Sequence, residues 1–576
     1  KIFYFKDLNN FIFLKVNEGS RFIDLQKFIE LLTPIIIIVI FLFFSILIFL
    51  SLKVNYKNKN NYNLHKLWWA VPLLIFFLES FSTNSYFIKA GGGSFHHWQP
   101  FTGVIEMMQQ GGLLLWDTPS QYGFLSLIFT YLIPFENPWL KVYILNGVFN
   151  LILSLLIFYV IWHKRNLYWY VFSLFFTYSI YFALPGGPWF NNISISPSAI
   201  FRSFWVILLI FVIYKIQLKE IFTQLKYIIP IWLVGFFWSV ESAVYVTSVI
   251  GTYFLGFIFL GKSKINSKIY VLLSFPASIL ICLILICLFY LININNLPDF
   301  FSFVEFVFGW FLELKNINTN LQTSNINSFG IILVILFFFS LFLNNHIVEK
   351  NKYLWFAVFG CCWAILSYFI SISGEHTVLG FVKYFCLGMF LLINNLNEND
   401  YNLVIKYISP LLLFVLIYSY GNPSLLIHVK KTLSNQNYSL NKVIYEKDNE
   451  LDNILNLIKP NDIPVLVVEK GRYLNYLHPN NYVDQESKKI IFLNDEIFLP
   501  IQPASMFIYL SQKRKSIYIN RWIKRHKSNN GWIITDKSHW HNSINSSLSK
   551  ITQNFNTIKE IELGPYQAVL YKKRED

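Results

Sequence analysis

Long apolar runs alternate with short polar segments over most of the chain, from about residue 31 to residue 424. A helix that crosses a bilayer needs about 20 apolar residues, and a shorter one is tolerated where protein covers it. The pattern therefore predicts about twelve spans, at 31–52, 67–83, 139–161, 167–183, 199–214, 227–240, 243–261, 269–293, 330–343, 353–372, 379–396 and 405–421. The fold class expected for this part is mainly α, a polytopic transmembrane helix bundle.

The pattern changes at about residue 425, where charged residues and asparagines become frequent again. Residues 446–458 have helical periodicity. Short β-branched or aromatic runs occur at 465–468, 490–493, 506–510, 532–535 and 568–571. We therefore predict a C-terminal α/β domain over residues 425–576, a segment of ordinary domain size.

The positions of the basic residues predict the orientation of the bundle. If the spans alternate in direction, one set of loops carries fourteen Lys and Arg residues and the opposite set carries only Lys89 and Lys315. Cytoplasmic loops of membrane proteins are rich in Lys and Arg. The loops with few basic residues are therefore expected outside the cytoplasm, together with the C-terminal domain. These loops are 84–138, 184–198, 294–329 and 373–378.

The N-terminal segment conflicts with this orientation. Residues 1–30 carry five basic residues, although the alternation places them outside the cytoplasm. Two explanations stay open: the segment is an interfacial helix, or one span near the start is miscounted. We treat 1–30 as a separate interfacial segment and 31–424 as the membrane domain.

Composition excludes several classes of protein. Of the 576 residues, 55% are hydrophobic and only 14% are charged, which is too few charges to cover a soluble enzyme of this size. The net charge of +15 is mainly a topology signal, so no nucleic acid partner is expected. The five cysteines lack metal-ligand spacing, and P-loop, zinc-protease and serine-hydrolase motifs are absent.

The external loop 84–138 contains more chemistry than a connector needs. Its stretch 101–110 has the pattern of a short helix, and a TPSQYG turn follows. The candidate catalytic residues here and at the end of the preceding span are Glu79, His96, His97, Glu106 and Asp117. A carboxylate and an imidazole at a membrane boundary suit general base catalysis or phosphate binding. Alternatively, the carboxylates are helix-end residues, and the histidines pack under Trp98 in an aromatic belt.

This arrangement resembles a known family. A polar group after an early span, a short helix ending in M-x-x-G-G, a W-D-x-P-like turn and a Y-G segment resemble the GT-C membrane glycosyltransferases. The loop is similar to the first external loop of the protein mannosyltransferase and aminoarabinose transferase branch. The resemblance covers about 50 residues by motif and the rest of the chain only by layout. It implies an external active site, a polyprenyl-phosphate-linked sugar donor and a loop carboxylate that deprotonates the acceptor.

The chain departs from that branch at one point. Where an acidic pair usually precedes the short helix, this sequence has His96 and His97. The base is then expected at Glu79, Asp117 or Glu106, or the histidines themselves serve. Trp98, Gln121 and Tyr122 are the candidate substrate contacts of the same loop.

Further polar residues lie near the predicted external face. Arg202 has the chemistry to hold a lipid phosphate, and its alternative role is that of an arginine that extends to the interface. Glu241 lies between two predicted short spans and is either a functional acid or the tip of a helical hairpin. Glu375, His376 and Lys383 flank the last short external loop, and we add them to the substrate-binding candidates.

The function expected from the resemblance is transfer of a sugar from a polyprenyl-phosphate donor to a glycan, lipid or protein acceptor, with inversion. The expected location is a bacterial inner membrane, with the active site outside the cytoplasm. No cofactor is required, although a divalent cation stays an open alternative and no metal ligands are assigned. Two other functions also stay open: a transporter or flippase of lipid-linked sugars, and a surface-polysaccharide polymerase or ligase.

Overall fold

The computed structural model describes part of the chain. The described residues are 68–80, 99–109, 111–118, 120, 123–134, 138–162, 167–178, 197–217, 219–260, 264–305, 353–361, 364, 391, 449–458, 465–469, 490–494, 517, 521, 530–536, 555–564 and 566–573. This part is mainly helical and contains one small sheet.

The helices of the bundle begin with α4 (Ala70–Ser80), followed by two short helices, α6 (Gln99–Gln109) and α7 (Leu125–Leu132). The remaining ones are α8 (Pro138–Ile161), α9 (Leu167–Tyr178), α10 (Pro197–Ile216), α11 (Ile221–Trp238), α12 (Val240–Leu260) and α13 (Ile265–Ile294). Among the described residues, four stretches are long and apolar enough to cross a membrane: Ile144–Ile161, Ile221–Trp238, Val240–Phe259 and Ile265–Ile294.

Two of these stretches agree with the predicted spans at 139–161 and 269–293 to within a few residues. At the predicted span 199–214, α10 forms a shorter apolar helix over Phe204–Ile216. The predicted break between 240 and 243 is wrong, because α11 ends at Trp238 and α12 begins at Val240. Ser239 makes this break: its Oγ accepts the backbone N–H of Ser242 at 3.1 Å, a typical helix cap. Glu241 therefore lies in the first turn of α12 and not in a linker.

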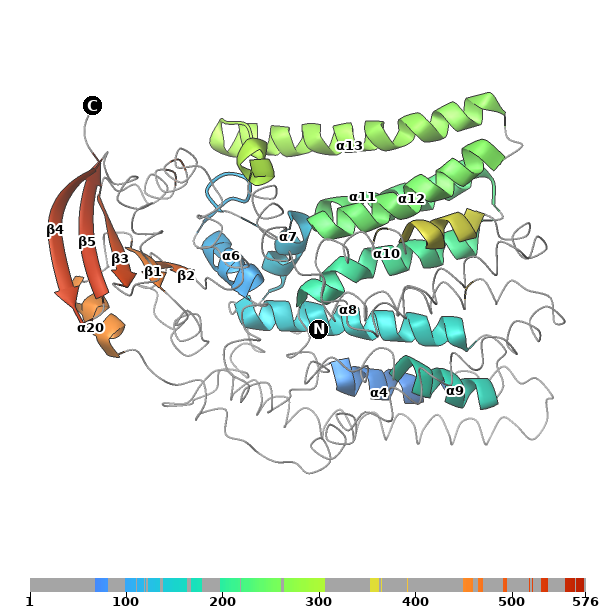
Figure 1. Ribbon diagram of the computed structural model, residues 1–576, viewed down its shortest axis with the longest axis horizontal. Helices are drawn as coiled ribbons and strands as arrows, with labels where there is room; N and C mark the ends of the chain where they lie inside the picture. Colours follow the sequence, from blue (N-terminus) through green and yellow to red (C-terminus); the bar gives the residue numbers. More distant parts are fainter. Residues whose placement is uncertain are drawn as a thin grey trace, which may run out of the picture.

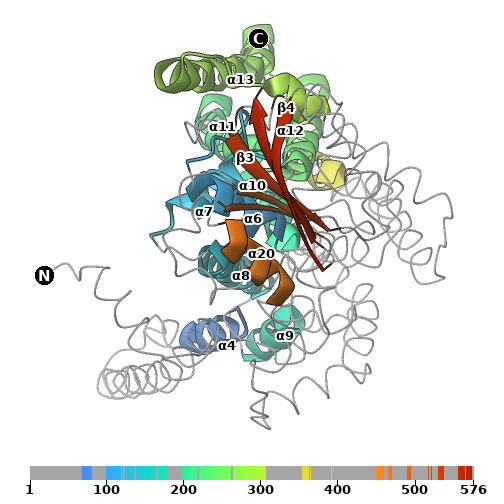
Figure 2. The ribbon, with the colours of Figure 1, turned by 90° about the vertical axis from the view of Figure 1, so that its left-hand side faces the viewer.

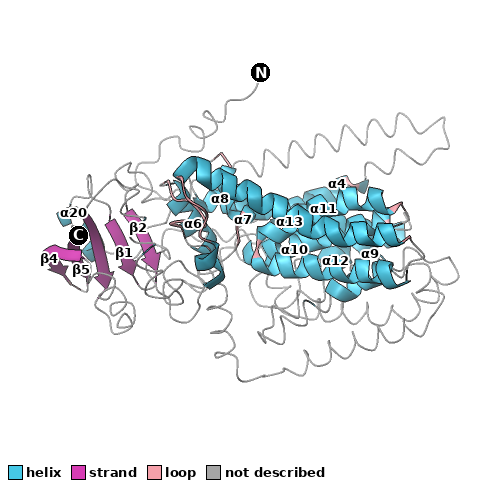
Figure 3. Cartoon of the chain, turned by 90° about the horizontal axis from the view of Figure 1, so that it is seen from above, coloured by secondary structure: helices cyan, strands magenta, loops and turns pink. Residues whose placement is uncertain are grey.

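Consecutive long helices alternate in direction, so that the starts of α8, α10 and α12 and the ends of α11 and α13 lie at one end of the bundle (Figure 1). Helices α6 and α7 lie at the same end, and the sheet lies beyond it (Figure 3). We call it the sheet-side end. The connections from α10 to α11 and from α12 to α13 lie at the opposite end. In or next to them are Lys215, Lys219, Lys264 and Lys268.

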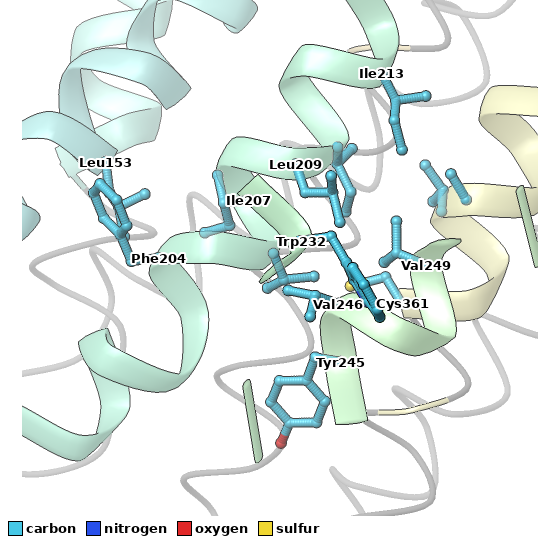
Figure 4. Close-up of a cluster of buried hydrophobic side chains, with 14 of the residues drawn as sticks. Leu153, Phe204, Ile207, Leu209, Ile213, Trp232, Tyr245, Val246, Val249 and Cys361 are labelled. Carbon is cyan, nitrogen blue, oxygen red and sulfur yellow. The ribbon is translucent and has the colours of Figure 1, made fainter. Parts of the chain in front are cut away.

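The bundle core is built from aliphatic and aromatic side chains of α8, α10, α11 and α12. Trp232, Val246 and Val249 pack together there, next to Cys361 (Figure 4). On the α8–α10 side, Phe149 stacks on Phe204 with ring centroids 4.0 Å apart. Such continuous apolar packing fixes the positions of the helix ends that carry the polar side chains.

The outer surface of α13 shows which environment surrounds the bundle. Large apolar side chains are exposed along the whole length of this helix: Ile265, Ile269, Leu272, Leu273, Leu280, Ile281, Ile284, Leu285, Leu288 and Ile292. An apolar surface of this length is not stable in water. The chain is therefore a membrane protein, and its apolar helices lie in a lipid bilayer.

The C-terminal part forms a five-stranded mixed sheet in the order β2-β1-β3-β5-β4. Its strands are β1 (Val465–Glu469), β2 (Ile490–Asn494), β3 (Asn530–Asp536), β4 (Phe555–Leu563) and β5 (Tyr566–Lys573). Strand β1 pairs in parallel with β2 and β3, whereas β5 pairs antiparallel with β3 and β4.

Helix α20 (Asn449–Ile458) covers part of this sheet, where Ile454 and Ile458 pack with Trp532 and Tyr566. Viewed along the bundle, the sheet and α20 lie in front of the helix ends (Figure 2). The helix predicted at 446–458 and the strands predicted at 465–468, 490–493, 532–535 and 568–571 are confirmed. The run at 506–510 lies outside the described residues, and β4 was not predicted.

Candidate functional site

The loop that follows α6 begins at a glycine that the backbone requires. Gly111 has φ +86°, in the left-handed region that favours glycine. Its N–H donates to Met108 O at 3.0 Å, and the N–H of Gly112 donates to Met107 O at 2.8 Å. These two bonds form a Schellman motif, the usual way to end a helix at a glycine. The short helix predicted at 101–110 is therefore present as α6, and the two glycines that follow it end the helix.

The residues after this helix end form a closed loop, 111–118. The backbone N–H groups of Trp116, Asp117 and Thr118 all donate to Leu113 O, at 3.1–3.2 Å. The side chain of Asp117 closes the loop from the other direction, because its Oδ1 accepts the N–H of Leu113 at 2.8 Å and the hydroxyl of Thr118 at 3.2 Å. Asp117 is only 4% exposed. Its carboxylate is therefore a structural part of the loop.

Three consecutive carbonyls of this loop accept hydrogen bonds from outside it. Leu114 O accepts the hydroxyl of Tyr290 in α13. Leu115 O accepts the backbone N–H of Asp299 at 2.7 Å, and Trp116 O accepts Nη1 of Arg521 at 2.6 Å. The loop is thus held by the end of α13, the turn that follows it and the C-terminal part of the chain.

Asp299 connects two of these segments. Its Oδ1 caps the helical turn 300–305 by accepting the N–H of Ser302 at 3.0 Å, and its Oδ2 accepts the hydroxyl of Ser302 at 2.8 Å. The same Oδ2 forms an ion pair with Arg521 Nη1 at 3.0 Å. Burial raises the pKa of this carboxyl, but the bonds from Ser302 and the charge of Arg521 outweigh burial and leave its pKa below the usual value.

A second ion pair lies at the sheet-side end of the bundle. Arg202 in the second turn of α10 and Glu241 in the first turn of α12 are 3.0 Å apart, between Nη2 and Oε1. Their side chains are 21% and 13% exposed, so both charges are largely removed from solvent. Oε2 of Glu241 has no hydrogen-bond partner within the described part of the chain. A largely buried pair of this kind at a helix end is a candidate for binding a charged or polar ligand.

Gly123 joins the loop region to the helix ends that carry this pair. It has φ +85°, and a Cβ built on it would lie 2.4 Å from the carbonyl oxygen of Trp238. The next residue, Phe124, donates its N–H to Phe237 O at 3.3 Å. Only glycine allows this approach of the chain to the α11–α12 turn, which explains the Y-G segment of the sequence.

Polar side chains also line one face of α8, a feature that the sequence reasoning missed. Asn146, Asn150 and Ser154 follow at intervals of four residues, and all three are fully buried. Both polar atoms of the Asn150 side chain lack a hydrogen-bond partner among the residues described. Phe149, on the same helix, lies 5.5 Å from the ring of Trp238. Buried amides are costly in a membrane helix, which marks them as functional candidates.

The other predicted site residues are only partly placed. Glu79 lies in the last turn of α4, and Glu106 lies in α6; the structure describes their backbone but not their side chains. Several residues lie outside the described ranges: His96, His97, Trp98, Gln121, Tyr122, Glu375, His376 and Lys383. Of the predicted candidates, the described geometry directly joins only Arg202 and Glu241.

The described part of the chain contains no group of three or more His, Cys, Asp or Glu side chains that could hold a metal ion. Comparison of the whole sequence with known proteins gives no assignment: no family model matches the chain, and no curated protein matches it.

Proposed function

We propose that the chain is an inverting membrane glycosyltransferase of the GT-C type, which transfers a sugar from a polyprenyl-phosphate-linked donor to a glycan, lipid or protein acceptor. The observation that carries the proposal is the ion pair between Arg202 and Glu241 at the same end of the bundle as loop 111–118. A partly buried guanidinium at the end of a membrane helix suits the phosphate of a lipid-linked donor.

The proposed topology follows from the charges. The bundle has about twelve spans, and its lysine-rich end, which includes Lys215, Lys219, Lys264 and Lys268, faces the cytoplasm of a bacterial inner membrane. The sheet-side end and a C-terminal domain over 425–576 then lie outside the cytoplasm. A donor whose sugar is displayed on the outer leaflet reaches the Arg202–Glu241 pair from the bilayer.

In the proposed reaction, a carboxylate removes the proton of the acceptor hydroxyl. The acceptor oxygen then attacks the anomeric carbon from the face opposite the phosphate. The bond between this carbon and the phosphate oxygen breaks, and polyprenyl phosphate leaves with the electron pair. Arg202 would stabilise the negative charge of the leaving group, while Glu241 fixes the orientation of the guanidinium.

Glu79, Asp117 and Glu106 are the proposed bases. Asp117 already uses Oδ1 in the two hydrogen bonds that close loop 111–118. Because Asp117 has this structural role, Glu79 is favoured as the base. His96, His97, Trp98, Gln121 and Tyr122 are proposed to orient the acceptor or the sugar, and Glu375, His376 and Lys383 to contact the donor. No cofactor is required in this scheme, and a divalent cation remains an alternative aid to the leaving group.

The proposal is tested by measuring transfer from a radiolabelled polyprenyl-phosphate sugar in proteoliposomes. We expect Glu79→Gln and Arg202→Gln to lower the turnover number at least about 100-fold, because each removes a charge that acts in the transition state. His96→Ala should lower it less. Normal transfer by all three variants would contradict the proposed site. Movement of the labelled lipid between leaflets without transfer would instead favour a flippase.

A further inference from the structure

The backbone of loop 111–118 is not stable in this shape by itself. Leu115 has φ +57°, in the left-handed region, where a leucine backbone costs roughly 1–2 kcal/mol. Residues in such conformations persist only where surrounding contacts determine them. Here the contacts are those to the carbonyls of Leu114, Leu115 and Trp116. The shape of the loop is therefore imposed by the segments around it.

Arg521 makes the most extensive of these contacts. Its Nη1 donates both to Trp116 O at 2.6 Å and to Asp299 Oδ2 at 3.0 Å. The guanidinium carbon also lies 3.7 Å from the centroid of the Trp116 ring. One side chain thus binds the backbone of the loop, stacks on its tryptophan and neutralises the carboxylate after α13. Guanidinium can do all three because it is planar and carries several donors.

These three groups come from distant parts of the sequence. Arg521 is 405 residues from Trp116 and 222 residues from Asp299, and it lies between β2 and β3 of the C-terminal sheet. Asp299 in turn donates its own N–H to Leu115 O. Asp299 therefore couples the ion pair with Arg521 to the strained backbone of Leu115.

We propose that Arg521 is a positioning residue, through which the C-terminal part of the chain holds loop 111–118 in its strained conformation against the end of α13. When the Arg521 side chain is removed, the loop relaxes and its connection to Asp299 loosens. This contact goes beyond the proposed function and does not depend on it; only its kinetic consequence rests on sugar transfer.

The contact is tested by hydrogen–deuterium exchange of the full chain in lipid nanodiscs. In Arg521→Ala, amides of 111–118 and 297–303 should exchange at least about tenfold faster, which corresponds to about 1.4 kcal/mol. Arg521→Lys should give an intermediate rate, because an ammonium pairs with Asp299 but does not stack in the same way. Amides of 240–260 should be unchanged and so report that the bundle remains folded.

Arg525→Ala is the matched control, since it removes the same charge four residues away in the sequence. Unchanged exchange of 111–118 in Arg521→Ala, or equal loosening in Arg525→Ala, would overturn the proposal. If Arg521→Ala also loosens 240–260, Asp299→Asn is the decisive variant, because it removes the charge that Arg521 pairs with and little volume. Unchanged 111–118 exchange in that variant would then overturn it.

The kinetic consequence separates this proposal from the proposed function. If the chain transfers sugar, Arg521→Ala should lower the turnover number at least about tenfold while the KM for the donor changes less than threefold, and Arg521→Lys should restore part of it. If wild-type protein transfers no sugar but the loop still loosens in Arg521→Ala, the positioning role stands and the proposed function fails.

Discussion

The functional side chains at the sheet-side end differ in how well their roles can be predicted from the sequence. Asp299 follows a proline at the end of a long apolar run and precedes a serine by three residues, which is a recognisable helix-cap pattern. Arg521 carries no such signal, because it is one of several basic residues in its segment and its partners are hundreds of residues away. Only the folded chain shows that these two residues meet.

Asp117 provides a test at this scale. Asp117→Asn keeps an oxygen that accepts the Leu113 N–H and the Thr118 hydroxyl, whereas Asp117→Ala leaves the partly buried N–H of Leu113 without this partner. We expect Asp117→Ala to lower the stability by about 1–3 kcal/mol and Asp117→Asn by clearly less. Thermal unfolding in detergent measures both. A similar loss in the two variants would show that the negative charge, and not the hydrogen bonds, closes the loop.

The pair of Asp299 and Arg521 should respond to pH. The pKa of Asp299 is lowered in the folded protein, so this group stabilises the fold above the unfolded pKa of about 3.9 and loses that contribution as the pH falls through the folded value. The difference in melting temperature between wild type and Asp299→Asn should be constant above about pH 5 and shrink in more acidic buffer. A difference that grows on acidification would contradict this assignment.

Whole elements were predicted better than the breaks between them. The lengths of the apolar segments were enough to locate α8, α10 and α13, because a helix in lipid must be apolar over most of its length. The α11–α12 break was misplaced because it depends on one serine cap, which hydropathy does not detect. Strand β4 was missed because it is an edge strand whose side chains are mostly exposed and alternate with charges.

The turn between α11 and α12 can be tested through Gly123. A methyl group there would meet Trp238 O at 2.4 Å, and the positive φ disfavours any other residue. Gly123→Ala should therefore lower the stability by about 1–3 kcal/mol in thermal unfolding. Gly251→Ala in α12 is the matched control: a Cβ there meets nothing within 4 Å, and alanine favours helix, so stability should stay equal or rise. Equal destabilisation in both variants would contradict the close approach.

The connection between α10 and α12 can be tested by a double-mutant cycle. Arg202→Gln and Glu241→Gln each leave one charge largely buried without its partner, while the double variant removes both. We expect the double variant to lose less stability than the sum of the losses in the two single variants, with a coupling of about 1–3 kcal/mol. Additive effects in thermal unfolding would show that the pair contributes nothing as a unit.

At the scale of the whole molecule, the sequence predicted a membrane helix bundle followed by an α/β part, and the described residues agree with that coarse arrangement. It did not predict how the two parts meet, because contacts between distant segments leave no periodic signal in the sequence. The buried asparagines of α8 were missed for a similar reason: without knowledge of which face is internal, Asn146 and Asn150 look like ordinary interruptions of an apolar run.

Sugar transfer by this chain is tested most directly by reconstitution with a doubly labelled donor. Wild-type protein in liposomes that contain a polyprenyl-phosphate sugar, labelled in the sugar and in the lipid, is mixed with candidate glycan, lipid and peptide acceptors. We expect one acceptor to gain the sugar with inverted anomeric configuration while an equal amount of polyprenyl phosphate is released. Sugar and lipid labels that stay joined with every acceptor, while the intact donor changes leaflet, would contradict it.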